Sequence, residues 1–191
     1  MMLSKGLNNL WPTPVLYDRI EPSVYEKVLN QAMQMDLSLP PSDFENGWYN
    51  DHLKVLEGTV ILPMMDSYMK EAFGVSVYDY KSWRMKKWLT GSHPTHQTGY
   101  AMQPHNHMGA KISAVLYLLA EGDETGSIVF VDPRTNANRG YDERFSKHFD
   151  FLKHEPKSGD IIIFPSFLWH YVYPTFSNLR LAMPMDLYLY E

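Results

Sequence analysis

The chain has 191 residues and a formal net charge of −5, and hydrophobic residues make up 45% of it. Length and apolar content allow a substantial core, so we do not expect global disorder. The negative charge, without a basic cluster, argues against non-specific nucleic-acid binding. Cysteine is absent, which excludes disulfides and thiolate metal sites, so any metal ion must be held by histidine, carboxylate or water.

The N-terminus carries no apolar signal-peptide core, and no apolar run reaches the length of a membrane span. We therefore expect a soluble, cytoplasmic protein without membrane contact. The sequence leaves the oligomeric state open, and a homodimer is compatible with it.

The first part of the chain, residues 1–74, predicts mainly helices. The apolar run Leu10–Tyr17 contains two prolines, and because proline cannot donate to a ladder it predicts an edge strand at best. Apolar residues then recur at helical spacing over 22–35 and again over 60–72. Gly74 is a suitable stop for the second helix.

From residue 75 onward the pattern changes to short apolar or alternating runs, which are typical of strands. The charged segment 135–156 interrupts them, and we interpret it as a loop insert with some helix and a candidate substrate lid. Helices first and strands after predict one α+β domain over 1–191, mainly β, with a jelly-roll core over 75–191. The expected strands cover residues 75–80, 83–89, 100–104, 112–119, 127–131, 160–164, 169–172 and 180–189.

Three histidines stand out by their position next to apolar strands. His105 and His107 precede the run Ile112–Leu119, and His170 follows the run Asp160–Phe164 and a proline-containing corner. In an extended chain residues i and i+2 point to the same face, so the first two imidazoles can reach one metal ion. The alternatives are two solvated loop histidines and, for His170, a hydrogen bond to a neighbouring loop.

Arg180 opens the last apolar run of the chain. An arginine directed into a barrel needs an anion, and its planar fork matches a carboxylate at two points. The alternative is an ion pair with Asp132, Asp160 or Glu155.

Four ordered motifs follow from these runs: His105-Asn106-His107, Ser113 to Tyr117, Gly126 to Arg134 and Gly159 to His170. They match a His-x-His pair, a Ser-x-x-x-Tyr strand, a Gly-x-x-x-Phe-x-Asp-Pro-Arg strand and a Gly-Asp…Phe-Pro-Ser…His corner. In this order they resemble the iron(II)- and 2-oxoglutarate-dependent oxygenases, most of all the small members known from bacteria and phages. The resemblance covers most of the chain.

The resemblance implies a double-stranded β-helix, cupin-like, with the N-terminal helices packed on the outside and iron(II) at one end of the barrel. His105 and His170 would occupy two metal-ligand positions. Arg180 would hold the distal carboxylate of 2-oxoglutarate. Tyr117 would add a hydrogen bond to that carboxylate, and Ser113 would line the cofactor pocket.

The pattern departs from the family at His107, which stands where the usual triad of two histidines and one acid has its Asp or Glu. With His107 as the third ligand, the site keeps a charge of about +2 rather than +1 and still attracts an anionic chelator. Because Arg180 needs an anionic partner, and because the resemblance implies 2-oxoglutarate, we interpret the chain as a 2-oxoglutarate-dependent dioxygenase. It would couple oxidative decarboxylation of 2-oxoglutarate by dioxygen to hydroxylation of a C–H bond in a small molecule or a protein side chain.

Two other functions stay open on the sequence. One is a three-histidine, cupin-type metalloenzyme that does not use 2-oxoglutarate. The other is a metal-free jelly-roll protein with a binding or structural role. Aromatic residues are candidates for pocket walls, although core packing suits each of them better: Trp83, Trp88, Phe167 and Trp169.

Overall fold

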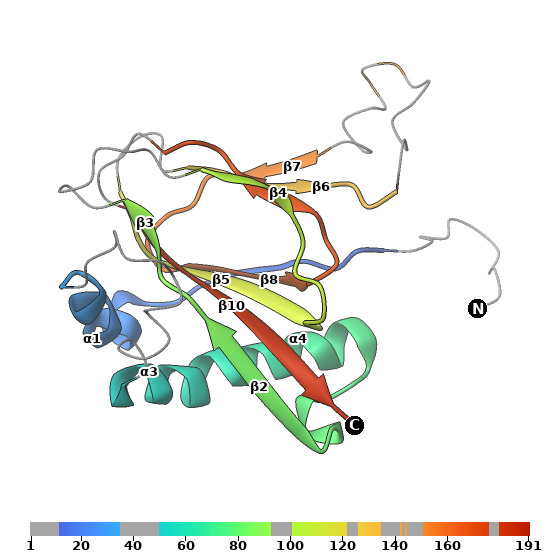
Figure 1. The fold of residues 1–191 in the computed structure, drawn as a ribbon, viewed down its shortest axis with the longest axis horizontal. Helices are drawn as coiled ribbons and strands as arrows, with labels where there is room; N and C mark the ends of the chain where they lie inside the picture. The colour runs from blue at the N-terminus through green and yellow to red at the C-terminus, as the bar shows by residue number, and fades with distance from the viewer. Residues whose placement is uncertain are drawn as a thin grey trace.

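The computed structural model describes residues 12–34, 50–92, 101–121, 126–134, 142, 144, 151–175 and 180–191. Within these residues two antiparallel sheets lie one above the other, and the helices cover the outer face of the larger sheet (Figure 1). The expected class, mainly β with N-terminal helices on the outside of a jelly-roll core, is confirmed. In the described ranges, no helix combines the length and the hydropathy that crossing a bilayer requires.

The larger sheet has the strand order β1-β8-β5-β10-β2, with β3 also paired to β10, and the smaller sheet has the order β4-β9-β6-β7. Apart from β6 and β7, neighbouring strands in both sheets are not consecutive in the chain, which is the crossover pattern expected of a jelly roll. The strands expected from residue 83 onward are confirmed with small shifts of their ends. The bounds are β1 (Leu16–Arg19), β2 (Ser82–Lys87), β3 (Thr90–Ser92), β4 (Met102–His105), β5 (Ile112–Ala120), β6 (Ile128–Val131), β7 (Phe151–His154), β8 (Asp160–Pro165), β9 (His170–Val172) and β10 (Arg180–Tyr190).

Strand β10 shows how the larger sheet separates two cores. Its residues alternate between the two faces of the sheet because the side-chain period of a strand is two. Leu181, Met183 and Met185 pack with the helices, whereas Ala182 packs inside the barrel with residues such as Phe130 of the smaller sheet. The inward face is the one that carries Arg180.

The helices are α1 (Pro22–Ala32), α3 (Asp51–Leu56), the π-helix η1 (Glu57–Ile61) and α4 (Leu62–Phe73). Pro63 is the second residue of α4, which continues η1 without a break, so its missing N–H falls directly after the π-turn, where the Leu62 N–H already bonds five residues back to the Glu57 carbonyl. Gly74 ends α4 in the left-handed conformation with φ 70°, and its N–H donates to the Lys70 carbonyl at 3.0 Å. Both expected helices are confirmed, whereas α3 was not predicted.

The prediction of a strand over 75–80 was wrong, because residues Val77–Asp79 form the 3-10 helix η2. Local capping explains the difference. The Tyr78 N–H donates to the Ser76 hydroxyl at 3.2 Å, and the Ser76 N–H donates to the Asp79 carboxylate at 2.7 Å. These side-chain bonds offer the backbone an alternative to a ladder, and they override a short apolar pattern.

The segment 135–156, expected to be a loop insert, ends in a strand. Phe151 to His154 form β7 and pair antiparallel with β6, so the loop prediction was wrong for these residues. Its role as a lid stays a prediction, because most of the segment lies outside the described residues.

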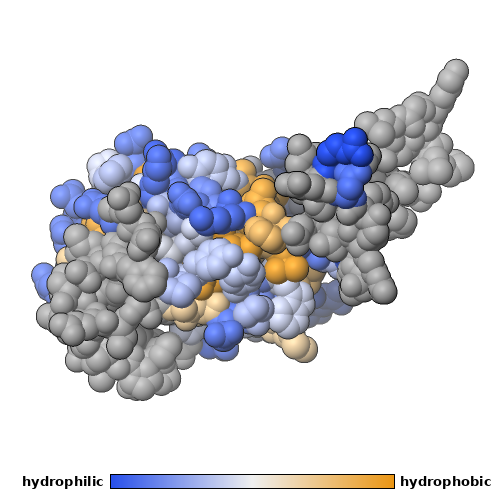
Figure 2. Space-filling view, turned by 90° about the horizontal axis from the view of Figure 1, so that it is seen from above, coloured by the Kyte–Doolittle hydropathy of each residue, from blue (hydrophilic) through white to orange (hydrophobic). Residues whose placement is uncertain are grey.

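Apolar residues gather on the side of the molecule that carries the smaller sheet. Figure 2, seen from above relative to Figure 1, shows an apolar patch among hydrophilic residues. Exposed apolar side chains of this sheet include Phe151 and Leu152 of β7, and Trp169 just before β9 is also exposed. Trp83 and Phe167 are exposed as well. The expectation that Trp83, Phe167 and Trp169 pack in the core was therefore wrong.

Candidate metal centre

Two of the three histidines meet because β4 and β9 pair. His105, the last residue of β4, lies directly opposite His170, the first residue of β9. Directly opposed residues of an antiparallel pair bring their side chains together on one face. The two ring centroids are 4.3 Å apart.

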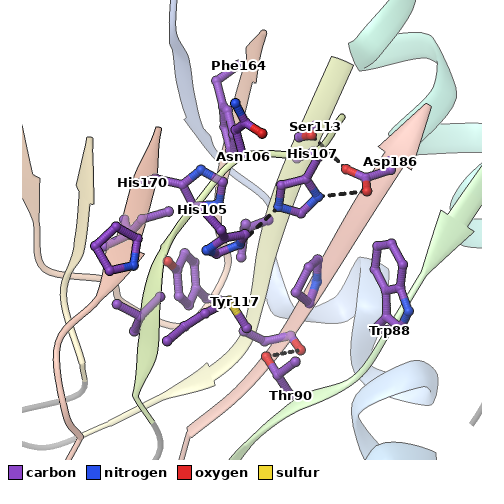
Figure 3. Close-up of a pocket in the computed structure, with 18 of the residues that line it drawn as sticks. Trp88, Thr90, His105, Asn106, His107, Ser113, Tyr117, Phe164, His170 and Asp186 are labelled. Atoms are coloured by element: carbon purple, nitrogen blue, oxygen red, sulfur yellow. Dashed lines mark hydrogen bonds and ion pairs between the residues drawn. The ribbon is translucent and has the colours of Figure 1, made fainter. Parts of the chain in front are cut away.

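The third histidine is held by the backbone of the corner between β8 and β9. The His107 N–H donates to the Ser166 carbonyl at 2.9 Å. This bond turns the chain after β4 so that the His107 ring lies 5.1 Å, centroid to centroid, from the rings of both His105 and His170. Figure 3 shows the three rings converging in the pocket between the sheets.

The arrangement of the ring nitrogens fits a metal ion. One ring nitrogen of each of the three histidines lies within 4.8 Å of the others. The Nε2 atoms of His105 and His107 are 3.2 Å apart, close to the separation of about 3 Å that two adjacent ligands adopt on an ion with bonds of about 2.1 Å. In the described part of the chain, this is the one group of three or more histidine or acidic residues with such geometry.

Each imidazole is oriented by a hydrogen bond at its other nitrogen. Nδ1 of His105 lies 2.8 Å from the Gln103 carbonyl, and Nδ1 of His170 lies 3.0 Å from the Leu168 carbonyl. A carbonyl only accepts, so both Nδ1 atoms must carry the proton, and in the neutral rings Nε2 keeps its lone pair. This is the second-sphere pattern of metal-ligating histidines.

The surroundings of His105 and His170 also favour the neutral ring by lowering the pKa of each. Burial lowers the pKa of His170 to about 4. Burial likewise lowers the pKa of His105, and the neighbouring His107 adds to this effect, although the Gln103 carbonyl opposes it. Because metal binding requires the neutral imidazole, the two rings are in the binding form at neutral pH without first losing a proton.

The histidines open into a pocket of about 580 Å³ that also contains Arg180, Tyr117 and Ser113. Arg180 is 2% exposed and Tyr117 is fully buried. The guanidinium carbon of Arg180 lies 5.5 Å from the centre of the Tyr117 ring.

A Cβ on Gly91 would lie 1.8 Å from the Arg180 carbonyl oxygen, so only glycine allows β3 to approach β10 this closely beside the arginine.

The three carboxylates that were alternative partners of Arg180 pair with other cations. Asp132 bonds to Arg134 at 2.5 Å, Asp160 to Arg19 at 2.8 Å, and Glu155 to Lys153 at 2.8 Å. None of these acids lines the pocket. Asp132 is therefore also not a replacement for the missing acidic ligand.

Sequence reasoning missed Asp186, which lines the pocket and is 2% exposed. Its Oδ2 lies 2.7 Å from Nδ1 of His107, and its Oδ1 accepts a hydrogen bond of 2.6 Å from the Ser113 hydroxyl. A signal existed in the period of β10: counting by two from Arg180 reaches Ala182, Pro184 and Asp186, and all of them line the pocket. Of the four candidate aromatic walls, Trp88 lines this pocket, with its ring 6.4 Å from that of His107.

Comparison with known proteins decides the family. Residues 88–186, more than half of the chain, match a family model described as "Putative 2OG-Fe(II) oxygenase". The chain belongs to this family of oxygenases. The matched residues include the three histidines, Arg180 and Asp186, and the resemblance seen in the sequence motifs is thereby confirmed. Among curated proteins, none matches the sequence.

Solved structures share the fold of this oxygenase at low sequence identity. A Pseudomonas putida prolyl-4-hydroxylase superposes with a TM-score of 0.61 at 13% identity, over 94% of this chain and 94% of that chain. The alpha-ketoglutarate-dependent epimerase SnoN from nogalamycin biosynthesis gives 0.60 at 11% identity, over 92% of this chain and 78% of that chain. AviO1 from Streptomyces viridochromogenes Tue57 gives 0.59 at 8% identity, over 92% and 90%. At these identities the likeness supports the shared fold.

Proposed function

We propose that this oxygenase is an iron(II)- and 2-oxoglutarate-dependent hydroxylase, with His105, His107 and His170 as metal ligands. The observation that carries the proposal is the convergence of three oriented imidazoles in the pocket that contains Arg180. The Nε2 atoms of His105, His107 and His170 would hold an iron(II) ion. SnoN, one of the structural neighbours, has been solved with Fe3+ and alpha-ketoglutarate, which supports the same pair of groups here.

Arg180 and Tyr117 would bind the far end of 2-oxoglutarate. Arg180 is buried inside the barrel and lines the same pocket as the three histidines. Its fork can bind a carboxylate at two points, and the Tyr117 hydroxyl is able to donate a further hydrogen bond. Ser113 reaches the same pocket but bonds to Asp186, so its contribution to 2-oxoglutarate would be indirect.

When bound, iron(II), 2-oxoglutarate and dioxygen supply the oxidative chemistry that hydroxylates a C–H bond. The chain itself orients the co-substrate between the histidines and Arg180 and excludes water with apolar walls such as Val115 and Phe164. The pocket volume lies within the roughly 300–1,000 Å³ of small-molecule sites. We propose a small molecule or a protein side chain as substrate.

The test is anaerobic titration of the full chain with iron(II) and 2-oxoglutarate. We expect a visible charge-transfer band, and succinate after air is admitted. In Arg180→Ala we expect the metal to bind but the band to require far more 2-oxoglutarate. If wild-type protein gives neither band nor succinate, the proposal fails.

A three-histidine metalloenzyme that does not use 2-oxoglutarate is the second candidate, and it is favoured by the absence of an acid from the ligand cluster of the described residues. It predicts metal binding without any effect of 2-oxoglutarate and no dependence of activity on Arg180. The same titration therefore separates the two candidates.

We also propose that residues 1–191 act as a single oxygenase domain, with 1–74 as a helical support. One hydrophobic cluster contains side chains from α1, α3, α4 and the larger sheet, which supports this organisation. Limited proteolysis would test it: a stable fragment that begins near residue 75 would contradict it.

A further inference from the structure

The ligand set proposed above lacks the carboxylate that an iron site of this type normally has. A buried carboxylate nevertheless lies behind one ligand. Asp186 is 2% exposed, and its Oδ2 is 2.7 Å from Nδ1 of His107. Figure 3 shows it on the side of the His107 ring that faces away from His105.

This position makes Asp186 a partner of the ligand rather than a ligand. Nδ1 and Nε2 lie on opposite sides of an imidazole, and Nε2 of His107 is the atom that faces His105, at 3.2 Å. A carboxylate bonded at Nδ1 therefore cannot reach an ion bound at Nε2. It can set the tautomer, aim the ring and increase the electron density at Nε2.

Two serines hold the carboxylate in place. The Ser113 hydroxyl donates to Asp186 Oδ1 at 2.6 Å, and the Ser166 hydroxyl lies 2.9 Å from that of Ser113. Because the Ser113 proton is already used, Ser166 must be the donor to Ser113. Ser166 also accepts the backbone N–H of His107 at 2.9 Å, so one residue anchors both the ligand and its partner.

The Asp186 carboxylate lies next to His107 and is not paired with a lysine or arginine side chain in the described residues. In the described part of the chain, its polar partners are His107 and Ser113, and no lysine or arginine lies within ion-pair distance of it. A buried anion of this kind is costly unless a cation lies nearby. A metal ion bound at Nε2 would provide that cation through the ring.

We propose that Asp186 is the positioning residue of this metal centre and supplies, from behind His107, the negative charge that the carboxylate of a two-histidine, one-carboxylate iron site provides directly. The inference rests on the proposed function, since it requires that the three histidines bind a metal ion. Ser113 and Ser166 hold the Asp186 carboxylate in this position through their hydrogen bonds.

The test uses cobalt(II) alone as the probe, titrated into the metal-free full chain and followed by its visible absorption. In Asp186→Asn the amide oxygen still accepts from Nδ1, so the ring stays oriented while the charge is lost. We expect the dissociation constant to rise about tenfold for Asp186→Asn and up to about 100-fold for Asp186→Ala, with an altered absorption band in both. Ser166→Ala keeps the carboxylate and should have a smaller effect of the same sign.

Asp66→Asn is the matched control. Asp66 is a buried aspartate that accepts hydrogen bonds from the Ser76 hydroxyl at 2.7 Å and the Val77 N–H at 2.9 Å, away from the pocket. It should lower the thermal midpoint and leave cobalt binding unchanged. Circular dichroism verifies that each variant is folded, and the isosteric Asn variant keeps the test valid if Asp186→Ala does not fold.

Three results would overturn the inference. If wild-type protein binds cobalt and both Asp186 variants bind it equally well with the same band, the inference fails and the proposed function stands. If His107→Ala binds cobalt normally while Asp186→Asn does not, Asp186 is itself the ligand. If wild-type protein binds no cobalt, iron(II) or manganese(II), the proposed function fails and the inference fails with it.

Discussion

Two buried aspartates of the larger sheet, Asp160 and Asp186, each contact a histidine, but their surroundings differ. Asp160 is 1% exposed and lies 3.1 Å from Nε2 of His154. Asp186 is 2% exposed and lies 2.7 Å from Nδ1 of His107. The pairs look alike in composition, and their roles are decided by what else surrounds them.

Around Asp160 the charge is satisfied locally. Nε and Nη2 of Arg19 donate to its Oδ1 at 2.9 and 2.8 Å, and the hydroxyl of Tyr17 donates at 3.1 Å. The backbone N–H of Lys157 donates to its Oδ2 at 2.8 Å. These bonds connect β1, β8 and the turn before β8, so we assign this cluster a structural role.

Asp186 and its histidine partner His107, by contrast, both line the pocket. His107 presents its other nitrogen to His105, and Arg180 lies in the same pocket rather than on the aspartate. A histidine–carboxylate pair therefore indicates a metal centre only when further imidazoles converge on its far side. Four experiments would test whether the two histidine–carboxylate pairs differ in this way.

The largest difference is expected between His107→Ala and His154→Ala. Loss of a direct ligand should weaken cobalt(II) binding by more than roughly 100-fold, because outer partners alone cost 10–100-fold. His154→Ala should leave binding unchanged, since His154 does not line the pocket. Spectroscopic titration measures both, and equal affinities for the two variants would remove the distinction between the two pairs.

Arg180 and Arg19 should likewise differ in their effect on 2-oxoglutarate binding. Arg180→Ala should weaken 2-oxoglutarate binding to the manganese(II) form by about 100-fold, the usual order for removing one partner of a buried charged pair. Arg19→Ala, whose side chain is 49% exposed, should bind 2-oxoglutarate as wild type does. Calorimetry measures both constants, and Arg180→Lys should retain part of the affinity because it keeps the charge but not the fork. Normal affinity in Arg180→Ala would favour the metalloenzyme that needs no 2-oxoglutarate.

Asp160→Asn should affect stability and not the site. We expect the free energy of unfolding at neutral pH to fall by about 2 kcal/mol, because the buried donors around residue 160 lose a charged acceptor. Urea unfolding provides this value, and cobalt(II) binding of the folded variant should equal that of wild type. Weaker metal binding in Asp160→Asn would show that the two regions are coupled.

The smallest expected effect is on how the free energy of unfolding changes at low pH. Burial of Asp160 opposes its ionisation, but the hydrogen bonds from the Lys157 backbone, Arg19, His154 and Tyr17 together hold its pKa below the usual range. The unfolded chain, with a pKa of about 3.9, takes up a proton first as the pH falls. The stabilisation is therefore complete above about pH 4 and is lost as the pH drops toward the lower pKa of the folded state. Urea unfolding over this range should show a shallower loss for Asp160→Asn than for wild type, and parallel curves would contradict the assignment.

Most of the strands, both expected helices and four of the candidate site residues could be predicted from the sequence alone: His105, His107, His170 and Arg180, which all line one pocket. Continuous apolar runs marked the residues that became β5, β8 and β10, because a strand that is buried on both faces is apolar along most of its length, and this is visible without its partners. The motif order around His105, His107, His170 and Arg180 was enough to indicate the oxygenase family. The sequence pattern gave a wrong prediction after Ser76, because the side chain of Ser76 caps a 3-10 helix where a strand was expected.

Which side chains meet in the pocket could not be predicted from the sequence, because it depends on how the strands pair. The pairing of β4 with β9 places His105 opposite His170, and the fold brings Asp186 to His107 across 79 positions of sequence. It also left Trp83, Phe167 and Trp169 at the surface and placed Trp88 in the pocket. A local pattern shows that a strand has an inward face, but strand order and register decide what that face contacts, and both depend on long-range packing.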